Sequence, residues 1–328
     1  MNTPALEIHL DADELARTLR ADVLTGLTAE AKWLPPKWFY DARGSELFEQ
    51  ITELPEYYPT RSERRILQDR AGDIARHTRA RTLIELGSGY STKTRLLLDA
   101  LSAQHTLERF VPMDVSPTAL TDAAERIGTE YPTLQVHNIV GDLTRHLKHL
   151  PGGADRMVAF LGGTIGNLEP AERAAFLADV RSVLEPGEHL LLGTDLVKSP
   201  SVVVPAYDDA AGVTADFNRN VLRVLNRSLG ADFEVDGFAH VALWDATHEW
   251  VEMRLRARWP MRVTLPGVGL VVDFAAGEEV RTEVSAKFRR TGIEHELAEA
   301  GFALDHWWTD PDGLFAVSLA SAVPTRAS

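Results

Sequence analysis

Residues 82–95, TLIELGSGYSTKTR, decide the fold class of this chain of 328 residues. An apolar run over 82–86, typical of a buried parallel strand, leads through a turn containing Gly87 and Gly89 into a predicted helix. Glycine lets the backbone approach a ligand closely, and the start of the helix offers N–H donors to an anion. The third position of the pattern is Ser91 rather than glycine, which suits a smaller adenosyl ligand better than a dinucleotide. The stretch therefore predicts the nucleotide-binding end of a doubly wound α/β domain.

Acidic residues end the next two predicted strands. Residues 110–117, FVPMDVSP, contain Asp114, 25 positions after Gly89, where a carboxylate would accept hydrogen bonds from both ribose hydroxyls of a nucleoside. Residues 134–143 end in Asp142 and Leu143, whose carboxylate and backbone N–H would accept from and donate to an adenine ring. The alternative is that both aspartates are ordinary turn formers. Acid-terminated strands in this order resemble the class I S-adenosylmethionine-dependent methyltransferases, which have a Rossmann-like sheet.

Composition and charge agree with an enzyme that acts on a small molecule. The chain is 45% apolar and 25% charged, with a net charge of −14. Such an acidic balance disfavours nucleic acid and anionic membranes as partners, because both are bound through basic surfaces. The chain has no cysteine, so disulfides and thiolate metal sites are excluded, and we expect no metal cofactor. There is no signal peptide or membrane-spanning run, and we expect a cytoplasmic monomer.

The alternation of strands and helices is interrupted by an insertion. After Asp195, a long helical segment and alternating runs typical of antiparallel strands occupy residues 198–286. The alternation returns with a helix and a closing pair of strands. We therefore expect a cofactor-binding domain of 60–197 plus 287–328 and an inserted α+β substrate-binding domain of 1–59 plus 198–286.

A second stretch makes the resemblance more specific. Residues 32–63 are rich in aromatic residues and proline, which is typical of a folded lid. Together with ELGSGYSTKT (85–94), LGGTIGNL (161–168) and EVSAKF (283–288), this stretch resembles the histidine-specific N-alpha-methyltransferases of ergothioneine biosynthesis. The resemblance covers nearly the whole chain and implies that the chain trimethylates the alpha-amino group of L-histidine, giving hercynine, with S-adenosylmethionine as methyl donor.

The resemblance also implies roles for individual residues. Lys93 would pair with the methionine carboxylate of the cofactor, although a lone lysine after such a loop is often solvated. Asn167 and Tyr207 would hold the substrate carboxylate, although an Asn after Gly is commonly a turn former and a Tyr before two aspartates a surface residue. The positions implied for the cofactor are Gly87, Lys93, Asp114, Asp142 and Leu143.

Two further positions would recognise the imidazole ring of the substrate. Glu283 and Ser285 lie two residues apart on an extended segment, so their side chains would project to one face and converge on one ring. The remaining positions implied for the substrate are Tyr57, Tyr40, Phe48 and Met253, of which Tyr40 is also a candidate general base and Met253 equally suits a core position. Asn167 and Tyr40 are the positions expected nearest the reacting atoms.

Three other functions remain open at this point. A dinucleotide-dependent oxidoreductase would share the first strand and Asp114 but would favour a third glycine. A non-catalytic adenosylmethionine-binding regulator would not need Asn167, Tyr207 and Glu283 together. A methyltransferase for another small amine or amino acid is the nearest competitor, because it would differ only in the substrate pocket.

Overall fold

The computed structural model describes residues 5–89 and 93–324, which form two compact units. Unit 1 comprises Met1–Leu10, Pro59–Val197 and Phe288–Ser328, and unit 2 comprises Asp11–Tyr58 and Lys198–Lys287. Ser91, which the sequence analysis used to judge the glycine pattern, lies outside the described residues.

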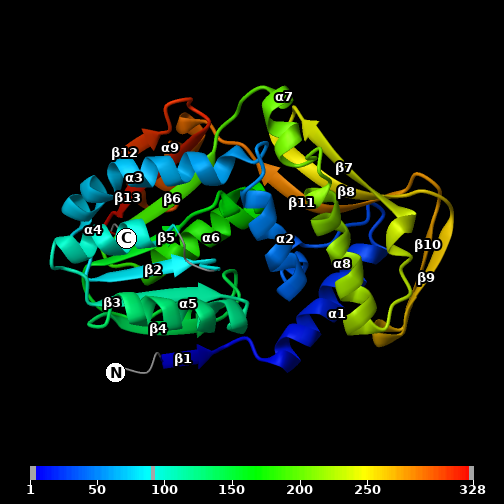
Figure 1. Cartoon of the computed structure of the whole chain (residues 1–328), viewed down its shortest axis with the longest axis horizontal. Coiled ribbons are helices and arrows are strands. Elements are labelled where there is room, and N and C mark those ends of the chain that lie inside the picture. The colour runs from blue at the N-terminus through cyan, green and yellow to red at the C-terminus, as the bar shows by residue number, and fades with distance from the viewer. Residues whose placement is uncertain (1–4, 90–92, 325–328) are drawn as a thin grey trace. The chain divides into compact units, whose positions relative to one another are not determined.

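Unit 1 is built on an eight-stranded sheet with the order β1-β4-β3-β2-β5-β6-β13-β12 (Figure 1). All neighbours from β1 to β6 are parallel, whereas β13 is antiparallel to both β6 and β12. The doubly wound α/β fold predicted from the sequence, with its closing antiparallel pair, is confirmed. The strands are β1 (Ala5–Ile8), β2 (Thr82–Leu86), β3 (Arg109–Asp114), β4 (Gln135–Val140), β5 (Arg156–Phe160), β6 (His189–Asp195), β12 (Phe302–Thr309) and β13 (Phe315–Ala322).

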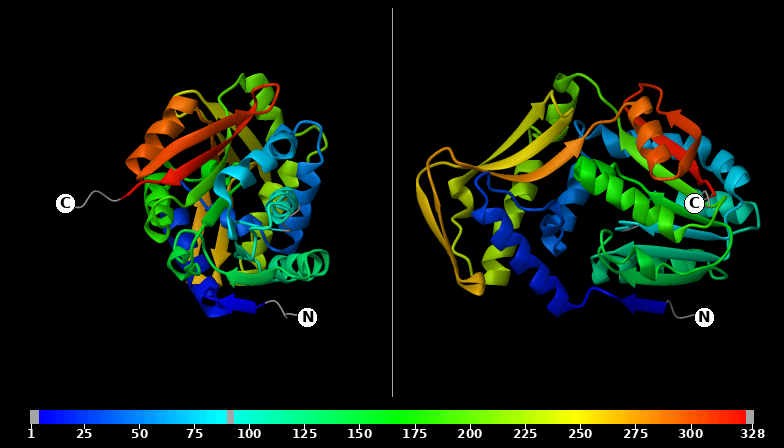
Figure 2. Two further views of the ribbon diagram at one scale, coloured as in Figure 1. Left: turned by 90° about the vertical axis from the view of Figure 1, so that its left-hand side faces the viewer. Right: turned by 180° about the vertical axis from the view of Figure 1, so that it is seen from behind.

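Helices cover both faces of this sheet, and the strands are apolar because both faces are buried. One buried cluster joins apolar residues of α3, α4 and α5 to the sheet, so these helices share a face. Helices α6 and α9 lie on the other face, which the right-hand view of Figure 2 shows from behind. Phe176 of α6 packs on Phe160 of β5, and α6 contacts α9. The helices are α3 (Tyr58–Thr78), α4 (Arg95–Ala103), α5 (Pro117–Glu130), α6 (Pro170–Val183) and α9 (Arg290–Glu299).

The start of the chain differs from the expected domain boundaries. Strand β1 pairs in parallel with β4, with Leu6 opposite Asn138, and so extends the large sheet. From the sequence these residues were grouped with the insertion, because four residues give too short a pattern to reveal a sheet partner 132 positions away. Residues 5–10 therefore belong to unit 1.

Unit 2 contains a three-stranded antiparallel sheet, β11-β8-β7, and a two-stranded sheet, β10-β9. The helix and antiparallel strands predicted within 198–286 are present. Helix α8 packs against α2 and β7. The elements are α1 (Ala12–Thr28), α2 (Ala42–Thr52), α7 (Pro200–Val203), α8 (Val213–Leu229), β7 (Phe238–Asp245), β8 (Trp250–Ala257), β9 (Met261–Leu265), β10 (Leu270–Phe274) and β11 (Glu279–Ala286).

Short 3-10 turns connect several of these elements. The two that matter for the site are η3 (Thr164–Asn167) in unit 1 and η4 (Val204–Ala206) in unit 2, which lead to Asn167 and Tyr207. The others are η1 (Pro36–Phe39), η2 (Leu147–His149), η5 (Val235–Gly237) and η6 (Pro266–Val268).

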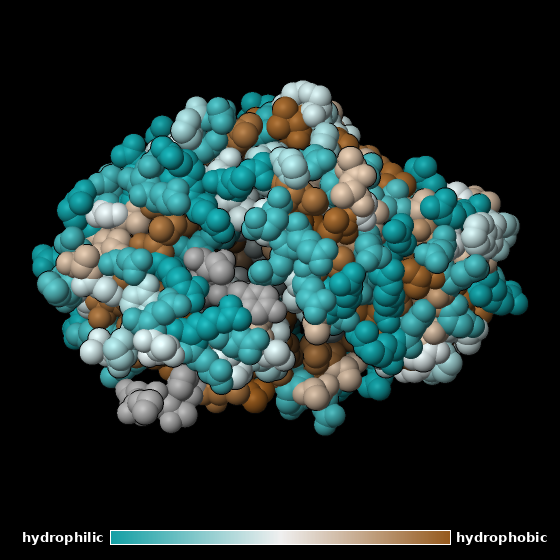
Figure 3. Space-filling view, viewed as in Figure 1, coloured by the Kyte–Doolittle hydropathy of each residue, from teal (hydrophilic) through white to brown (hydrophobic). Residues whose placement is uncertain are grey.

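Hydrophilic residues predominate on the face of the molecule seen in Figure 3, and the apolar residues there form smaller areas. Among the helices of the described residues, none is long and apolar enough to cross a membrane.

Candidate active site

The glycine turn after β2 is held by the carboxylate that ends β3. Oδ2 of Asp114 accepts the backbone N–H of Gly89 at 2.9 Å, and Oδ1 accepts the N–H of Ser116 at 3.0 Å. Burial raises the pKa of the Asp114 carboxyl, and the N–H donors of Gly89, Ser116 and Val115 oppose that rise. Gly87 and Gly89 both have positive φ, 67° and 48°, which favours glycine. The predicted pair of glycine turn and acidic strand end is therefore brought together.

A second acidic strand end lies after β4. Oδ1 of Asp142 accepts the backbone N–H and the hydroxyl of Thr144 at 2.8 and 2.6 Å, and its own N–H donates to Nδ1 of His146 at 3.0 Å. Asp142 is buried and Leu143 is half-buried. A Cβ on Gly87 would lie 3.7 Å from Leu143, so the loops after β2 and β4 are neighbours. The structure thus brings Gly87, Asp114, Asp142 and Leu143 to one edge of the sheet.

Lys93 has a partner that sequence reasoning missed. Its ammonium forms an ion pair with Glu63 of α3, whose side chain is fully buried. The other Glu63 oxygen accepts the backbone N–H of Gly162 at 2.7 Å, and Gly193 leaves room for it, because a Cβ at that position would overlap the carboxylate. A Glu within a charged helical run, TRSERR, gives no sequence signal for such a role.

Asn167 lies at the end of η3, in the loop that Glu63 holds at Gly162. The loop turns through Gly162 and Gly163, with φ of 80° and 70°, and Asn167 is half-buried. Because the loop follows the carboxyl end of β5, Asn167 lies at the same edge of the sheet as the glycine turn after β2.

Unit 2 contains a buried polar cluster that joins two predicted residues and one missed residue. The hydroxyls of Tyr207 and Ser285 lie 2.7 Å apart, and the ammonium of Lys287 donates to both at 2.8 Å. The same ammonium lies 4.7 Å from the centre of the Tyr207 ring. All three residues are buried. Lys287 lies two positions after Ser285 at the end of β11, a spacing that would have placed both on one face.

From the sequence, Tyr207 is expected at the carboxylate of the substrate and Ser285 at its imidazole. In the structure their hydroxyls are in hydrogen-bond contact. The resemblance supplied each role separately, and nothing in the local pattern indicates that β11 passes beside η4. Any ligand that reaches one of these hydroxyls is therefore within reach of the other and of the Lys287 ammonium.

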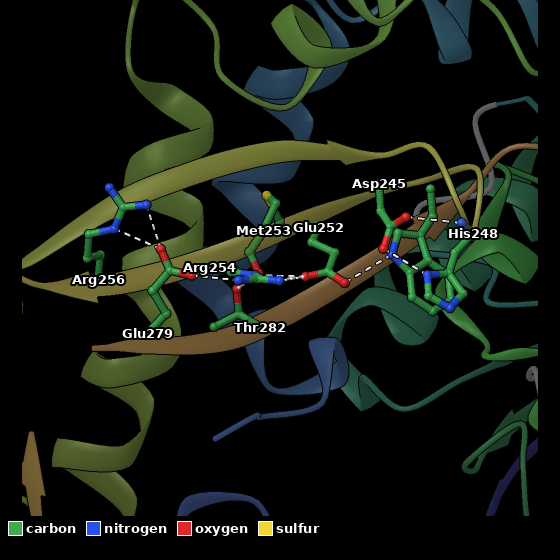
Figure 4. Close-up of polar contacts among 9 residues, drawn as sticks. Asp245, His248, Glu252, Met253, Arg254, Arg256, Glu279 and Thr282 are labelled. Atoms are coloured by element: carbon green, nitrogen blue, oxygen red, sulfur yellow. Dashed lines mark hydrogen bonds and ion pairs between the residues drawn. The ribbon is translucent and has the colours of Figure 1, made fainter. Parts of the chain in front are cut away.

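Glu283 faces β8 just beyond an irregularity in strand pairing. The register between β11 and β8 shifts between Arg281 and Glu283, and Glu283 then lies opposite Met253. The intervening Thr282 hydroxyl lies 3.0 Å from the Met253 carbonyl (Figure 4). Met253 is buried and Glu283 is half-buried. Such a bulge redirects a side chain, and here it fixes the Glu283–Met253 pair.

Charged side chains lie along the same two strands. Arg254 pairs with Glu252 and, at 2.6 Å, with Glu279, which also pairs with Arg256 at 2.6 Å (Figure 4). Glu279 thus links β11 to β8 on the N-terminal side of Thr282, while Glu252 and Arg254 pair within β8. This row stabilises the register on which the Glu283–Met253 pair depends.

The predicted aromatic wall is also a contact network within unit 2. Phe48 packs edge-on against Tyr40 and Tyr57, with ring centres 5.5 and 6.2 Å apart. Phe217 of α8, which sequence reasoning missed, contacts Tyr40 at 5.4 Å and Phe48 at 5.9 Å. Offset and edge-on pairs of this kind are the favoured aromatic geometry. Both chain neighbours of Tyr40 are tied to α8, because the Asn220 amide donates to the Phe39 carbonyl and to the Asp41 carboxylate.

The buried side chain of His240 contacts the backbone of Tyr207. His240 Nε2 lies 2.8 Å from the Tyr207 carbonyl, and Nδ1 lies 2.8 Å from the amide nitrogen of Asn218. Since Asn218 accepts from the Thr282 hydroxyl at 2.6 Å, its NH₂ is the group that faces His240. The network therefore requires a neutral ring with its proton on Nε2, and burial lowers the pKa of His240 accordingly.

Comparisons with known proteins identify the family of the chain. The family model for histidine-specific, S-adenosylmethionine-dependent methyltransferases matches residues 19–322. Histidine N-alpha-methyltransferases from Mycolicibacterium smegmatis and Mycobacterium tuberculosis are 56% and 53% identical, covering 97% and 95% of this chain and 99% and 98% of theirs. Ergothioneine biosynthesis protein 1 of Neurospora crassa is 30% identical over 84% of this chain and 32% of its own length. The chain belongs to the family of histidine-specific, S-adenosylmethionine-dependent methyltransferases.

Proposed function

We propose that this chain transfers methyl groups from S-adenosylmethionine to the alpha-amino group of L-histidine, three times in succession, and so makes hercynine, the first intermediate of ergothioneine biosynthesis. The observation that carries the proposal is the extent of the family match. It spans residues 19–322 and therefore includes unit 2 as well as the cofactor fold. Membership of this family argues against the dinucleotide-dependent oxidoreductase that the sequence left open.

Unit 1 has the groups that an adenosyl cofactor requires. We assign the ribose hydroxyls to Asp114, the adenine ring to Asp142 and the backbone N–H of Leu143, and the methionine carboxylate to Lys93. A Cβ on Gly89 would meet no atom of the described residues within 4 Å, which agrees with space for a ligand beside Asp114. When bound, the cofactor supplies an electrophilic methyl group on a sulfonium. Glu63 orients Lys93 and, through Gly162, the loop that carries Asn167.

Unit 2 has the groups that a histidine substrate requires. We assign the imidazole to Glu283 and Ser285, with Met253 bounding its pocket and Tyr57, Tyr40 and Phe48 as the aromatic wall. Tyr207 and Asn167 then contact the substrate carboxylate. Since the Tyr207 and Ser285 hydroxyls lie 2.7 Å apart, the carboxylate and the imidazole of the bound substrate come close together at this pair. The Lys287 ammonium, held 2.8 Å from the Tyr207 hydroxyl, adds a positive charge that favours an anionic group at this end.

The reaction depends mainly on alignment of the amine with the methyl group and on exclusion of water. The nucleophile is a neutral amine that attacks in line, so the residues that hold the substrate provide most of the effect. Because the attacking amine must be neutral, an ammonium loses one proton before each of the three transfers, and Tyr40 is our candidate acceptor. Because the substrate is held by its carboxylate and imidazole, the amine can rotate and gain bulk between transfers. Mono- and dimethylhistidine are therefore also substrates. The transfer needs no metal, because the sulfonium already activates the methyl group.

The remaining expectations stay predictions. We propose a cytoplasmic monomer that acts on a small molecule and uses neither nucleic acid nor a membrane. The net charge of −14 supports the second part, because both of those partners are bound through basic surfaces.

Mass spectrometry of the protein incubated with S-adenosylmethionine and each of the twenty amino acids tests the proposal. Histidine should be converted to its trimethyl form, and dimethylhistidine should be accepted when supplied directly. Methylation of a different amino acid without histidine would identify the competing methyltransferase. Tight binding of adenosylhomocysteine without turnover of any amino acid would identify a regulator instead.

A further inference from the structure

A group of three potential metal ligands lies in unit 1, outside the cofactor positions. His77 near the end of α3, His189 at the start of β6 and Asp305 in β12 each offer one ligand atom, and these atoms lie within 4.8 Å of one another. Nε2 of His77 is 3.9 Å from Oδ2 of Asp305, and the His77 and His189 rings meet edge-on at 5.6 Å. Three separate elements thus direct nitrogen and oxygen atoms at one point.

An irregularity in β12 sets the direction of the third side chain. The pairing of β12 with β13 shifts between Leu304 and His306, so Asp305 is the extra residue of a bulge. In a regular strand Asp305 and His306 would point to opposite faces of the sheet. Here both reach His77, with Nε2 of His306 at 3.3 Å from His77 Nδ1. The bulge therefore places two polar side chains on one side of an edge strand.

Neighbouring side chains orient His77 and Asp305, so that one atom of each points toward the other. The contact with His306 is at Nδ1 of His77, so Nε2 is the atom directed at Asp305. Ser321 of β13 donates to Oδ1 of Asp305 at 3.2 Å, so Oδ2 faces His77. The His306 ring is itself stacked on Trp308, with centres 4.9 Å apart. Metal sites typically have such outer partners, which fix the tautomer of a histidine and the rotation of a carboxylate.

There is space beside the cluster for further ligands. A hollow of about 320 Å³ is lined by His77, His306, Trp308, Asp73 and Arg76. Arg76 is paired with Asp73, which compensates its charge locally. Water molecules in this hollow would complete the coordination of an ion held by three protein atoms.

We propose that His77, His189 and Asp305 bind a divalent first-row transition-metal ion, and we choose Zn²⁺ as the probe. Two imidazoles and one carboxylate suit zinc better than the all-oxygen sites of magnesium and calcium. Tetrahedral zinc with bonds near 2.0–2.2 Å places its ligand atoms roughly 3.3 Å apart. The ligand atoms would therefore move closer to one another by about 1 Å when the ion binds.

This site is separate from the methyl-transfer chemistry. His189 begins β6 and lies at the amino end of the strand, whereas the cofactor positions follow the carboxyl ends of β2, β3 and β4. A strand of seven residues spans about 20 Å. The ion would join α3, β6 and β12, so its effect should be on the stability of unit 1 rather than on turnover.

Titration of Zn²⁺ into the full chain without a polyhistidine tag tests the site. We expect one ion per chain and a rise in melting temperature of roughly 5–10 °C at a hundredfold excess of Zn²⁺ over its Kd. His77→Ala and Asp305→Ala should abolish the shift. His306→Ala, which removes only an outer partner, should weaken binding about 10- to 100-fold. Methyl transfer should proceed equally with and without EDTA.

A matched control is His105→Asn, which removes an exposed histidine of unit 1 at a positive φ of 56° that asparagine tolerates. It should bind Zn²⁺ like the unaltered chain. The proposal is overturned if His77→Ala and Asp305→Ala, folded as judged by circular dichroism, keep the zinc affinity of the unaltered chain. It is also overturned if His149→Ala alone abolishes binding, since that would place the ion at the stacked pair His9–His149.

Discussion

The two units place the groups that we assign to ligand binding in different ways. In unit 1 the groups lie on loops that follow parallel strands, and short-range backbone contacts hold them, as when Asp114 accepts from Gly89 and Ser116. In unit 2 the groups come from segments far apart in sequence, as when Tyr207 meets Ser285 and Lys287. A cofactor shared by many enzymes can be held by a recurring strand-end pattern, whereas a particular substrate requires contacts specific to this chain.

The largest effect is expected at the backbone-held carboxylate. Asp114→Ala should lower the affinity for adenosylhomocysteine by more than a hundredfold, because it removes two hydrogen bonds to a charged acceptor, each worth about 1.5–3 kcal/mol. Calorimetric titration measures this loss. The exposed Asp179→Ala in α6 is the control and should bind normally. Unchanged affinity in Asp114→Ala would make this residue a turn former, and the strand-end account of unit 1 would be wrong.

The Glu63–Lys93 pair shows whether unit 1 also depends on a long-range contact. Glu63→Ala should lower the free energy of unfolding by about 3–5 kcal/mol, because it leaves Lys93 without this carboxylate and removes the acceptor of Gly162. Urea denaturation measures the change, and Glu125→Ala, exposed on α5, serves as control. The double variant with Lys93→Ala should lose less than the sum of the single losses. Additivity within about 0.5 kcal/mol would show that the two residues are not coupled.

In unit 2, Glu283→Ala should cost about 1.5–3 kcal/mol of histidine affinity, roughly a ten- to hundredfold loss, if its carboxylate accepts from the imidazole. Discrimination against tryptophan should relax, and more so when Met253→Ala enlarges the space opposite. Side-by-side turnover of histidine and tryptophan measures both effects. Equal loss on both substrates, with Asn167→Ala alone changing their ratio, would show that the two ends of the substrate are reversed.

The smallest effect concerns the support of Tyr207 by His240. Because the pKa of His240 is lowered in the folded protein, the unfolded chain binds the proton more readily. Stability should therefore fall as the pH drops from about 6.5, the ordinary histidine value, through the lowered pKa. A loss of about 1 kcal/mol, the net worth of one hydrogen bond, is expected. Urea denaturation of His240→Gln should show a flatter dependence in this range, and an identical dependence in both proteins would contradict the assignment.

The difference between the units also explains how far the sequence could be read. Local patterns predict the succession of strands along the chain and the positions of Gly87, Gly89 and Asp114. Each of these residues is adjacent to the strand that positions it. Glu63 was missed, because its partners lie 30 and 99 positions away and a glutamate in a charged helix looks solvated. Phe217 was missed for the same reason, since its ring contacts Tyr40 and Phe48, which lie far away in the sequence. Lys287 was missed although its spacing of two residues from Ser285 on an extended segment indicates a shared face.

The residues of unit 2 were found through the family resemblance and not through periodicity. The bulge that aligns Glu283 with Met253 depends on Thr282 meeting β8, and nothing within residues 279–286 reveals that contact. The β1 strand was likewise grouped with the wrong unit, because the strand that it pairs with among the described residues, β4, lies far away in the sequence.

The central claim is that the buried cluster of Tyr207, Ser285 and Lys287 binds histidine while unit 1 binds the cofactor independently. It is tested most directly by titrating histidine into Lys287→Met that is saturated with adenosylhomocysteine, since methionine keeps the bulk of the side chain and removes its charge. The account predicts a ten- to hundredfold loss of histidine affinity, about 1.5–3 kcal/mol, with cofactor affinity unchanged. Unchanged histidine affinity, or an equal loss of both affinities, would contradict it.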